Sequence, residues 1–337
     1  MSAMSPPPRL ELALAPTPIL RLERLSRRLG VEFYVKRDDL TGLVEAGHMI
    51  RKLEFLAGEA LGLGADTLIT GGTIQSSGGR AVSAVAARLG LRAILAIEGE
   101  RPDSYDGDVL LGRLLGAEIR WVDQGGSPLE EALEGIAAEV RGAGGRPYRI
   151  PENGASDVGA LGYLECAVEL AGQVSHGAPR FDTIVIAARS GTSQAGLLMG
   201  KQLTGLPSEI VGVPVVHTVE DVRRCVTATI ERAIHRFGLA LDLPKAIHLL
   251  DGYQGAPGHA ADDEDLRAIV ALARDEGLVL DPGSSIKAFR ALVDTLGRDA
   301  HALGQRVCFM HTGAPFDLFP LRDRLTRCLD GQVAPRA

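Results

Sequence analysis

The sequence predicts an α/β protein of two lobes, each built on a parallel sheet flanked by helices. From about residue 65 onward, short apolar runs rich in β-branched residues alternate with amphipathic helical patterns, and glycine-rich turns join them. Strands that alternate with helices imply crossover connections and therefore parallel strands. The chain has 337 residues, and single cores stop growing near roughly 250–300 residues, so two lobes are expected.

The strands fall into two groups separated by a long helical pattern. We expect strands at residues 67–70, 93–97 and 119–122, and then at 183–187, 210–213, 247–250 and 307–310. Helices are expected at residues 50–63, 80–89, 129–141, 159–170, 197–203, 219–237 and 263–277. The pattern near 155–175 begins with a capping Ser156 and leads from one lobe to the other. This predicts a small domain of residues 46–164 and a large domain of residues 1–45 plus 165–337.

Composition excludes several classes of function. A net charge of -7, with no basic block, argues against nucleic acid as a partner. The chain has no apolar run of about 20 residues and no signal-like start, so we expect a cytoplasmic protein without a membrane span. The four cysteines are widely spaced, which predicts neither a metal site nor a disulfide framework. A small-molecule substrate is the expected partner.

Three glycine-rich turns follow predicted strands, at residues 70–80, 189–196 and 311–315. Ligands of parallel sheets collect at the carboxyl ends of the strands. In the second turn, Ser190, Gly191, Thr192 and Ser193 precede a helix and are candidate phosphate donors. A tight turn that binds nothing is the alternative. In the first turn, Ser76 and Ser77 are candidates to hold a carboxylate or act as a nucleophile, with plain helix capping as the alternative. No Walker motif or clean G-x-G-x-x-G supports nucleotide binding.

Taken in order, these turns and their flanking segments resemble fold-type II pyridoxal-phosphate enzymes, nearest to the 1-aminocyclopropane-1-carboxylate (ACC) deaminase and D-cysteine desulfhydrase branch. The resemblance covers about 300 residues and includes 16–20, 34–40, 51–55, 71–80, 190–196, 280–282 with Lys287, and 311–313. It implies a tryptophan synthase β-like architecture, pyridoxal phosphate between the lobes, a homodimer, and lyase-type or isomerase-type chemistry on a small amino-acid-like or phosphorylated substrate.

The resemblance breaks where the family carries its Schiff-base lysine. The family motif G-N-K-x-R-K reads Gly47-His48-Met49-Ile50-Arg51-Lys52 here, and a thioether cannot form an imine. The family's Asn-His pair reads Ser77-Gly78, and its Tyr-Glu or Tyr-Thr pair after L-D-P reads Ser284-Ser285. His259 stands where the deaminases carry a tyrosine. These changes predict a reworked site, with an engineered lysine knock-out as the alternative.

Residue roles follow from the resemblance and from side-chain chemistry. Lys52 lies three residues beyond Met49, with Cβ atoms roughly 5–6 Å apart, but the shift of about 4.5 Å along the axis makes a structural cation the competing interpretation. His48 is a candidate general acid or base, because its unperturbed pKa lies near 6.5. We expect catalytic roles for His48, Lys52, Ser76 and His259; cofactor contacts from Ser190, Gly191, Thr192, Ser193, Ser285 and Thr312; and substrate contacts from Met49, Gln75, Ser77, Gly78 and Ser284.

Three functions remain open. The first is an enzyme in which pyridoxal phosphate binds without a Schiff base at residue 49, or in which a phosphorylated small molecule takes its place. The second is a non-catalytic relative that keeps only ligand binding. The third is a deaminase or desulfhydrase whose lysine has been replaced.

Overall fold

Two sheets form the framework of the computed structural model, which describes residues 4–122, 128–255, 261–313 and 315–331. The larger sheet has the order β1-β2-β10-β7-β8-β9 and the smaller has the order β5-β4-β3-β6. The strands are β1 (Ile19–Arg21), β2 (Glu32–Lys36), β3 (Thr67–Thr73), β4 (Arg92–Glu98), β5 (Glu118–Val122), β6 (Pro147–Arg149), β7 (Thr183–Ala188), β8 (Glu209–Pro214), β9 (His248–Leu249) and β10 (Arg306–Met310).

All neighbouring strands pair in parallel except β1, which runs antiparallel to β2. The exception follows from the short connection between these two strands, since a parallel crossover needs a dozen or more residues. The predicted α/β class with parallel sheets flanked by helices is confirmed. Three strands were not predicted: β1, β2 and the edge strand β6, which begins at a proline.

Helices cover both faces of each sheet, so the central strands are apolar at consecutive positions. In β7, Ile184 and Ile186 pack into one core cluster, while Val185 between them packs into another. The helices are α1 (Glu23–Leu29), α2 (His48–Gly62), α3 (Ser77–Leu89), α4 (Gly107–Leu114), α5 (Leu129–Gly142), α6 (Asp157–Ser175), α7 (Thr192–Thr204), α8 (Val219–Phe237), α9 (Asp263–Glu276), α10 (Ser285–Arg298) and α11 (Arg322–Leu329), with 3-10 turns η1 (Asp38–Leu40), η2 (Glu152–Gly154) and η3 (Pro315–Leu321). Within the described residues, none of these helices has the length and apolar character needed to cross a bilayer.

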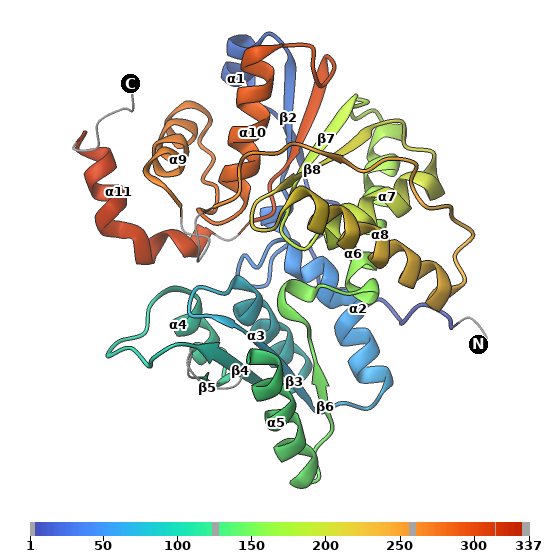
Figure 1. The fold of residues 1–337 in the computed structure, drawn as a ribbon, viewed down its shortest axis with the longest axis vertical. Coiled ribbons are helices and arrows are strands. Elements are labelled where there is room, and N and C mark those ends of the chain that lie inside the picture. The colour runs from blue at the N-terminus through green and yellow to red at the C-terminus, as the bar shows by residue number, and fades with distance from the viewer. Residues whose placement is uncertain (1–3, 123–127, 256–260, 314, 332–337) are drawn as a thin grey trace.

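Helices α2 and α6 lie between the two lobes (Figure 1). Helix α6 packs closely against α2 and α7, and glycines make both approaches possible. A Cβ at Gly162 would stand 2.2 Å from the Arg51 carbonyl oxygen, and one at Gly196 would stand 2.2 Å from the Ala160 carbonyl oxygen. Because α6 runs unbroken from Asp157 to Ser175, it contains the predicted domain boundary at residues 164/165. This packing fixes the start of α2 relative to the start of α7.

Candidate functional site

A polar cavity lies where the starts of α2, α3 and α7 converge with the loops after β6 and β10. It encloses about 810 Å³ of space, open solvent at its mouth included. Its lining includes eleven of the predicted site residues: His48, Lys52, Gln75, Ser76, Ser77, Ser190, Gly191, Thr192, Ser193, Ser284 and Thr312. The structure therefore brings together residues that span more than 260 positions of the sequence.

The turn from Ser190 to Ser193 forms one wall of the cavity at the start of α7. Gly191 has φ +74°, and a Cβ there would stand 2.5 Å from a methyl carbon of Val226, so the turn requires glycine. No side chain caps this helix, and the first amides of a helix have no partner within it. The Ser190 and Thr192 hydroxyl oxygens lie 3.0 Å apart. Amides, hydroxyls and the positive end of the helix dipole are the groups that suit an anion, so this turn is a candidate anion site.

The start of α3 forms a second wall. Ser76 is the N-cap residue with extended backbone, yet its hydroxyl makes no capping hydrogen bond. Capping, the competing interpretation of this serine, is therefore absent, and the hydroxyls of Ser76 and Ser77 line the cavity. Gly78 lies buried in the first turn of α3 and is not among the lining residues, which differs from its predicted contact with substrate.

His48 lies at the first position of α2, and its Nδ1 lies 3.3 Å from the Thr312 carbonyl oxygen. Since a carbonyl only accepts, this contact assigns the ring proton to Nδ1 and leaves Nε2 as an acceptor. Burial, followed by the nearby positive charge of Lys52, lowers the pKa of His48 to about 3. The imidazole is neutral at physiological pH.

Lys52 lies one turn farther along α2, on the same face as His48. Its side chain is 2% exposed, and Nζ donates a 2.9 Å hydrogen bond to the Asn153 carbonyl. Asn153 adopts φ +53°, a conformation that asparagine tolerates better than most residues. Burial lowers the pKa of Lys52 to about 7. The lysine is thus a buried amine at the cavity wall.

Met49 does not reach the cavity. It is 1% exposed and packs into the main hydrophobic core, and the described cavity wall does not include it. Around the helix axis Met49 lies about 100° from His48 and about 60° from Lys52, and there its side chain meets the core and not the cavity. This position differs from the one predicted for it, in the wall of a substrate site.

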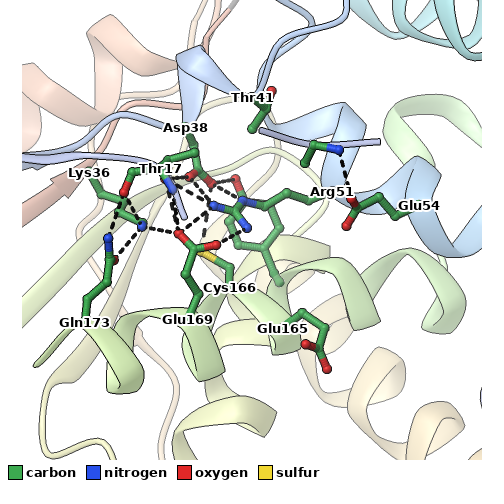
Figure 2. A network of polar contacts seen from close by, with 12 residues as sticks. Thr17, Lys36, Asp38, Thr41, Arg51, Glu54, Glu165, Cys166, Glu169 and Gln173 are labelled. Carbon is green, nitrogen blue, oxygen red and sulfur yellow. Dashed lines mark hydrogen bonds and ion pairs between the residues drawn. The ribbon is translucent and has the colours of Figure 1, made fainter. Parts of the chain in front are cut away.

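The adjacent Arg51 faces the large lobe instead (Figure 2). Its Nη2 donates to Asp38 Oδ1 at 2.8 Å, and its Nη1 donates to Glu169 Oε2 at 2.8 Å. Burial alone would lower the pKa of Arg51, but Asp38 and Glu169 raise it well above its ordinary value. Arg51 is a structural cation that ties α2 to η1 and α6.

The remaining wall comes from the loops that precede α10 and follow β10. Asp281 accepts backbone hydrogen bonds from Gly283, Ser284 and Ser285, at 3.1, 2.6 and 3.0 Å, and so orders the start of α10. The Ser285 hydroxyl is fully buried and lies 3.0 Å from the Thr312 hydroxyl. Ser285 itself is outside the lining, so the structure places it behind Thr312.

A carboxyl pair lies at the rim. Burial and the neighbouring Asp108 raise the pKa of Asp317 well above its ordinary value. Asp108 is also bound by the buried Arg80 of α3. The raised pKa favours the protonated form of Asp317 beside the cavity that it lines.

Several lining residues were not predicted from the sequence: Thr73, Glu152, Asn153, Ala187, Arg189, Asp281, Gly283, Gly313 and Asp317. The Pro-Glu-Asn-Gly turn around Asn153 was a detectable turn signal, but nothing local placed it beside α2. His259 lies outside the described residues.

Comparisons with known proteins agree with this geometry. Residues 10–313 match the family model described as pyridoxal-phosphate dependent enzyme. The chain is 39% identical to a D-cysteine desulfhydrase of Klebsiella pneumoniae (strain 342), over 94% of this chain and 97% of the relative. It is 38% identical to a Pyrococcus abyssi protein named as a candidate 1-aminocyclopropane-1-carboxylate deaminase, over 96% of each. The solved structure of an ACC deaminase homologue superposes with a TM-score of 0.86 and 35% identity, covering 95% of this chain and 96% of that one.

Proposed function

The chain belongs to the family of pyridoxal-phosphate dependent enzymes, and we propose that its cavity binds this cofactor and carries out lyase-type or deaminase-type chemistry on a small amino acid. The relatives named as D-cysteine desulfhydrase and ACC deaminase, at 38–39% identity across nearly the whole chain, support this substrate class. Because the chain is similar to relatives of both names, D-cysteine and ACC are the two substrates to test first.

The observation that carries the proposal is the anion site at the start of α7. Its glycine is required by the contact with Val226, its helix start is uncapped, and its hydroxyls line the cavity. These donors fit a phosphate monoester, which carries up to two negative charges at neutral pH. Ser190, Gly191, Thr192 and Ser193 would hold the phosphate, and Thr312 and Ser284 would face the rest of the cofactor.

When bound, pyridoxal phosphate supplies an electron sink for a carbanion at the α-carbon of an amino acid. The protein's own groups would orient that amino acid. The free hydroxyls of Ser76 and Ser77 suit its carboxylate. His48 is neutral, so its Nε2 is available to accept a hydrogen bond. The raised pKa of Asp317 favours its protonated form, which would donate a hydrogen bond at the cavity wall.

One observation favours a second function, a relative that binds a phosphorylated ligand without turning it over. The residue at the family's lysine position is a methionine packed in the core. On this alternative, the phosphate site is used for ligand recognition alone. A third possibility is a deaminase or desulfhydrase whose lysine has been replaced. In that case Met49→Lys alone should restore strong deaminase or desulfhydrase activity.

The experiment combines binding and turnover. Equilibrium dialysis of the purified protein against pyridoxal phosphate should show saturable binding, and Ser193→Asp should weaken it at least tenfold by placing a negative charge in the anion site. Ser104→Asp, which adds the same charge at an exposed loop, is the matched control and should bind as the parent does. Ammonia release from ACC and sulfide release from D-cysteine then test turnover. Absence of cofactor binding would refute the proposed function, whereas binding without turnover would support the ligand-binding alternative.

A further inference from the structure

The sequence contains five lysines, and their surroundings differ sharply. Lys36 is buried and paired with Glu169, and Lys287 is paired with Asp265. Lys201 and Lys245 lie outside the cavity, in the last turn of α7 and in the exposed segment before β9. Lys52 is the lysine that lines the described cavity wall. Elimination therefore leaves one amine able to meet a ligand held there.

Lys52 has no ion-pairing carboxylate among the described residues. Its hydrogen bond is to a backbone carbonyl, that of Asn153, and such a bond does not require the lysine to be charged. Gly154, which has φ +62°, leaves space for the lysine stem, since a Cβ there would stand 3.1 Å from the Lys52 Cδ. The fold makes room for this side chain without neutralising its charge.

Helix geometry brings the amine back toward the first turn of α2. Side chains on an α-helix lean toward its N-terminus, and residues four apart share a face within about 40°. Lys52 therefore extends back toward the level of His48, in the first turn of the helix. Met49, at about 60° from Lys52, points into the core instead.

We infer that Lys52 is the residue that bonds covalently to the aldehyde carbon of pyridoxal phosphate, in place of a lysine at position 49. This inference rests on the proposed function, because the anion site at α7 must hold the phosphate. The Lys52 nitrogen attacks the aldehyde carbon, a carbon–nitrogen double bond replaces the carbon–oxygen double bond, and the oxygen departs as water with both protons of the neutral amine. The step is a condensation and needs no oxidant or reductant.

The protonation state of the cavity favours this step. With a pKa of about 7, roughly half of Lys52 is the neutral, nucleophilic amine at neutral pH. In an exposed lysine with a pKa near 10.4, the neutral fraction at the same pH is on the order of a thousandfold smaller.

The test is to add one equivalent of pyridoxal phosphate, reduce with borohydride, digest, and locate the modified residue by mass spectrometry. We expect the adduct on Lys52, forming faster as pH rises through about 7. Lys52→Met should lose the adduct while still retaining cofactor in dialysis through the α7 anion site. Lys201→Met is the matched control and should keep the adduct. Circular dichroism of both variants checks that they fold.

Two outcomes would overturn the inference while leaving the proposed function intact: an adduct on a different lysine, or saturable binding without any reducible adduct. Loss of all binding by the parent protein would instead refute the proposed function. The dialysis and the mass spectrum therefore separate the two failures.

Discussion

Arg51 and Lys52 are consecutive buried cations on α2, and they differ in what surrounds them. Arg51 meets two carboxylates, those of Asp38 and Glu169, within a network that also includes Lys36 and Thr17 (Figure 2). Lys52 meets a single backbone carbonyl. The pKa of Arg51 is raised, whereas that of Lys52 is lowered to about 7.

The difference shows how one helix serves two purposes. A rotation of about 100° separates adjacent residues, so α2 presents one cation to the large lobe and the next to the cavity. Arg51, whose charge is neutralised by carboxylates, joins the two lobes through hydrogen bonds that occupy its guanidinium group. The other is kept without a carboxylate and is therefore available as an amine. Three substitutions break or sharpen this contrast.

The largest effect is expected from Arg51→Met. Removing the guanidinium leaves Asp38, which is fully buried, without its main counter-charge. Breaking a buried pair in this way costs about 3–5 kcal/mol. Urea denaturation should show this loss in the free energy of unfolding. Arg141→Ala, which removes an exposed pair with Glu134, is the control and should change stability by about 0.5 kcal/mol or less. A loss below about 1 kcal/mol for Arg51→Met would contradict the structural role.

Lys52→Met should change the free energy of unfolding in the opposite direction, and so stabilise the protein at pH 7. The pKa of Lys52 is lowered in the folded protein, so between about 7 and 10.5 the unfolded chain binds more protons and the parent's stability rises with pH. The variant lacks this dependence and should be more stable than the parent at pH 7, by about 1–4 kcal/mol. Unfolding curves recorded at pH 7 and pH 10 measure both quantities. If the variant were less stable at pH 7, Lys52 would be a structural cation like Arg51.

The smallest effect is expected from Asn153→Asp, which supplies the carboxylate that Lys52 lacks. Aspartate fits the positive φ of this position, and a nearby negative charge raises the pKa of the lysine by on the order of one unit. Reductive labelling of Lys52 at pH 7 should slow several-fold and recover at higher pH. Asn153→Ser, which adds no charge, is the comparison. Equal labelling of the two variants would show that the added carboxylate does not act on the amine.

Much of the fold was predictable from local patterns. The helix expected at residues 219–237 is found at Val219–Phe237, and the seven predicted strands lie within a few residues of their predicted ends. Short elements such as β1, β6 and α4 were missed because their periodicity is too brief to detect, and the five-residue central strand β2 was missed as well. The antiparallel β1 depends on the length of its connection, which a general α/β pattern does not reveal.

The sequence by itself determined the alternation of strands and helices, the glycine-rich turn at the start of α7, and the absence of a lysine at position 49. These are local properties, set by periodicity, turn chemistry and residue identity. Only the tertiary structure decided which of the five lysines faces the cavity and that Met49 does not. Which side chains of α2 face the cavity depends on the rotation of this helix about its axis. Contacts with residues far away in sequence, at Gly162 of α6 and at the Asp38 and Glu169 carboxylates, fix this rotation.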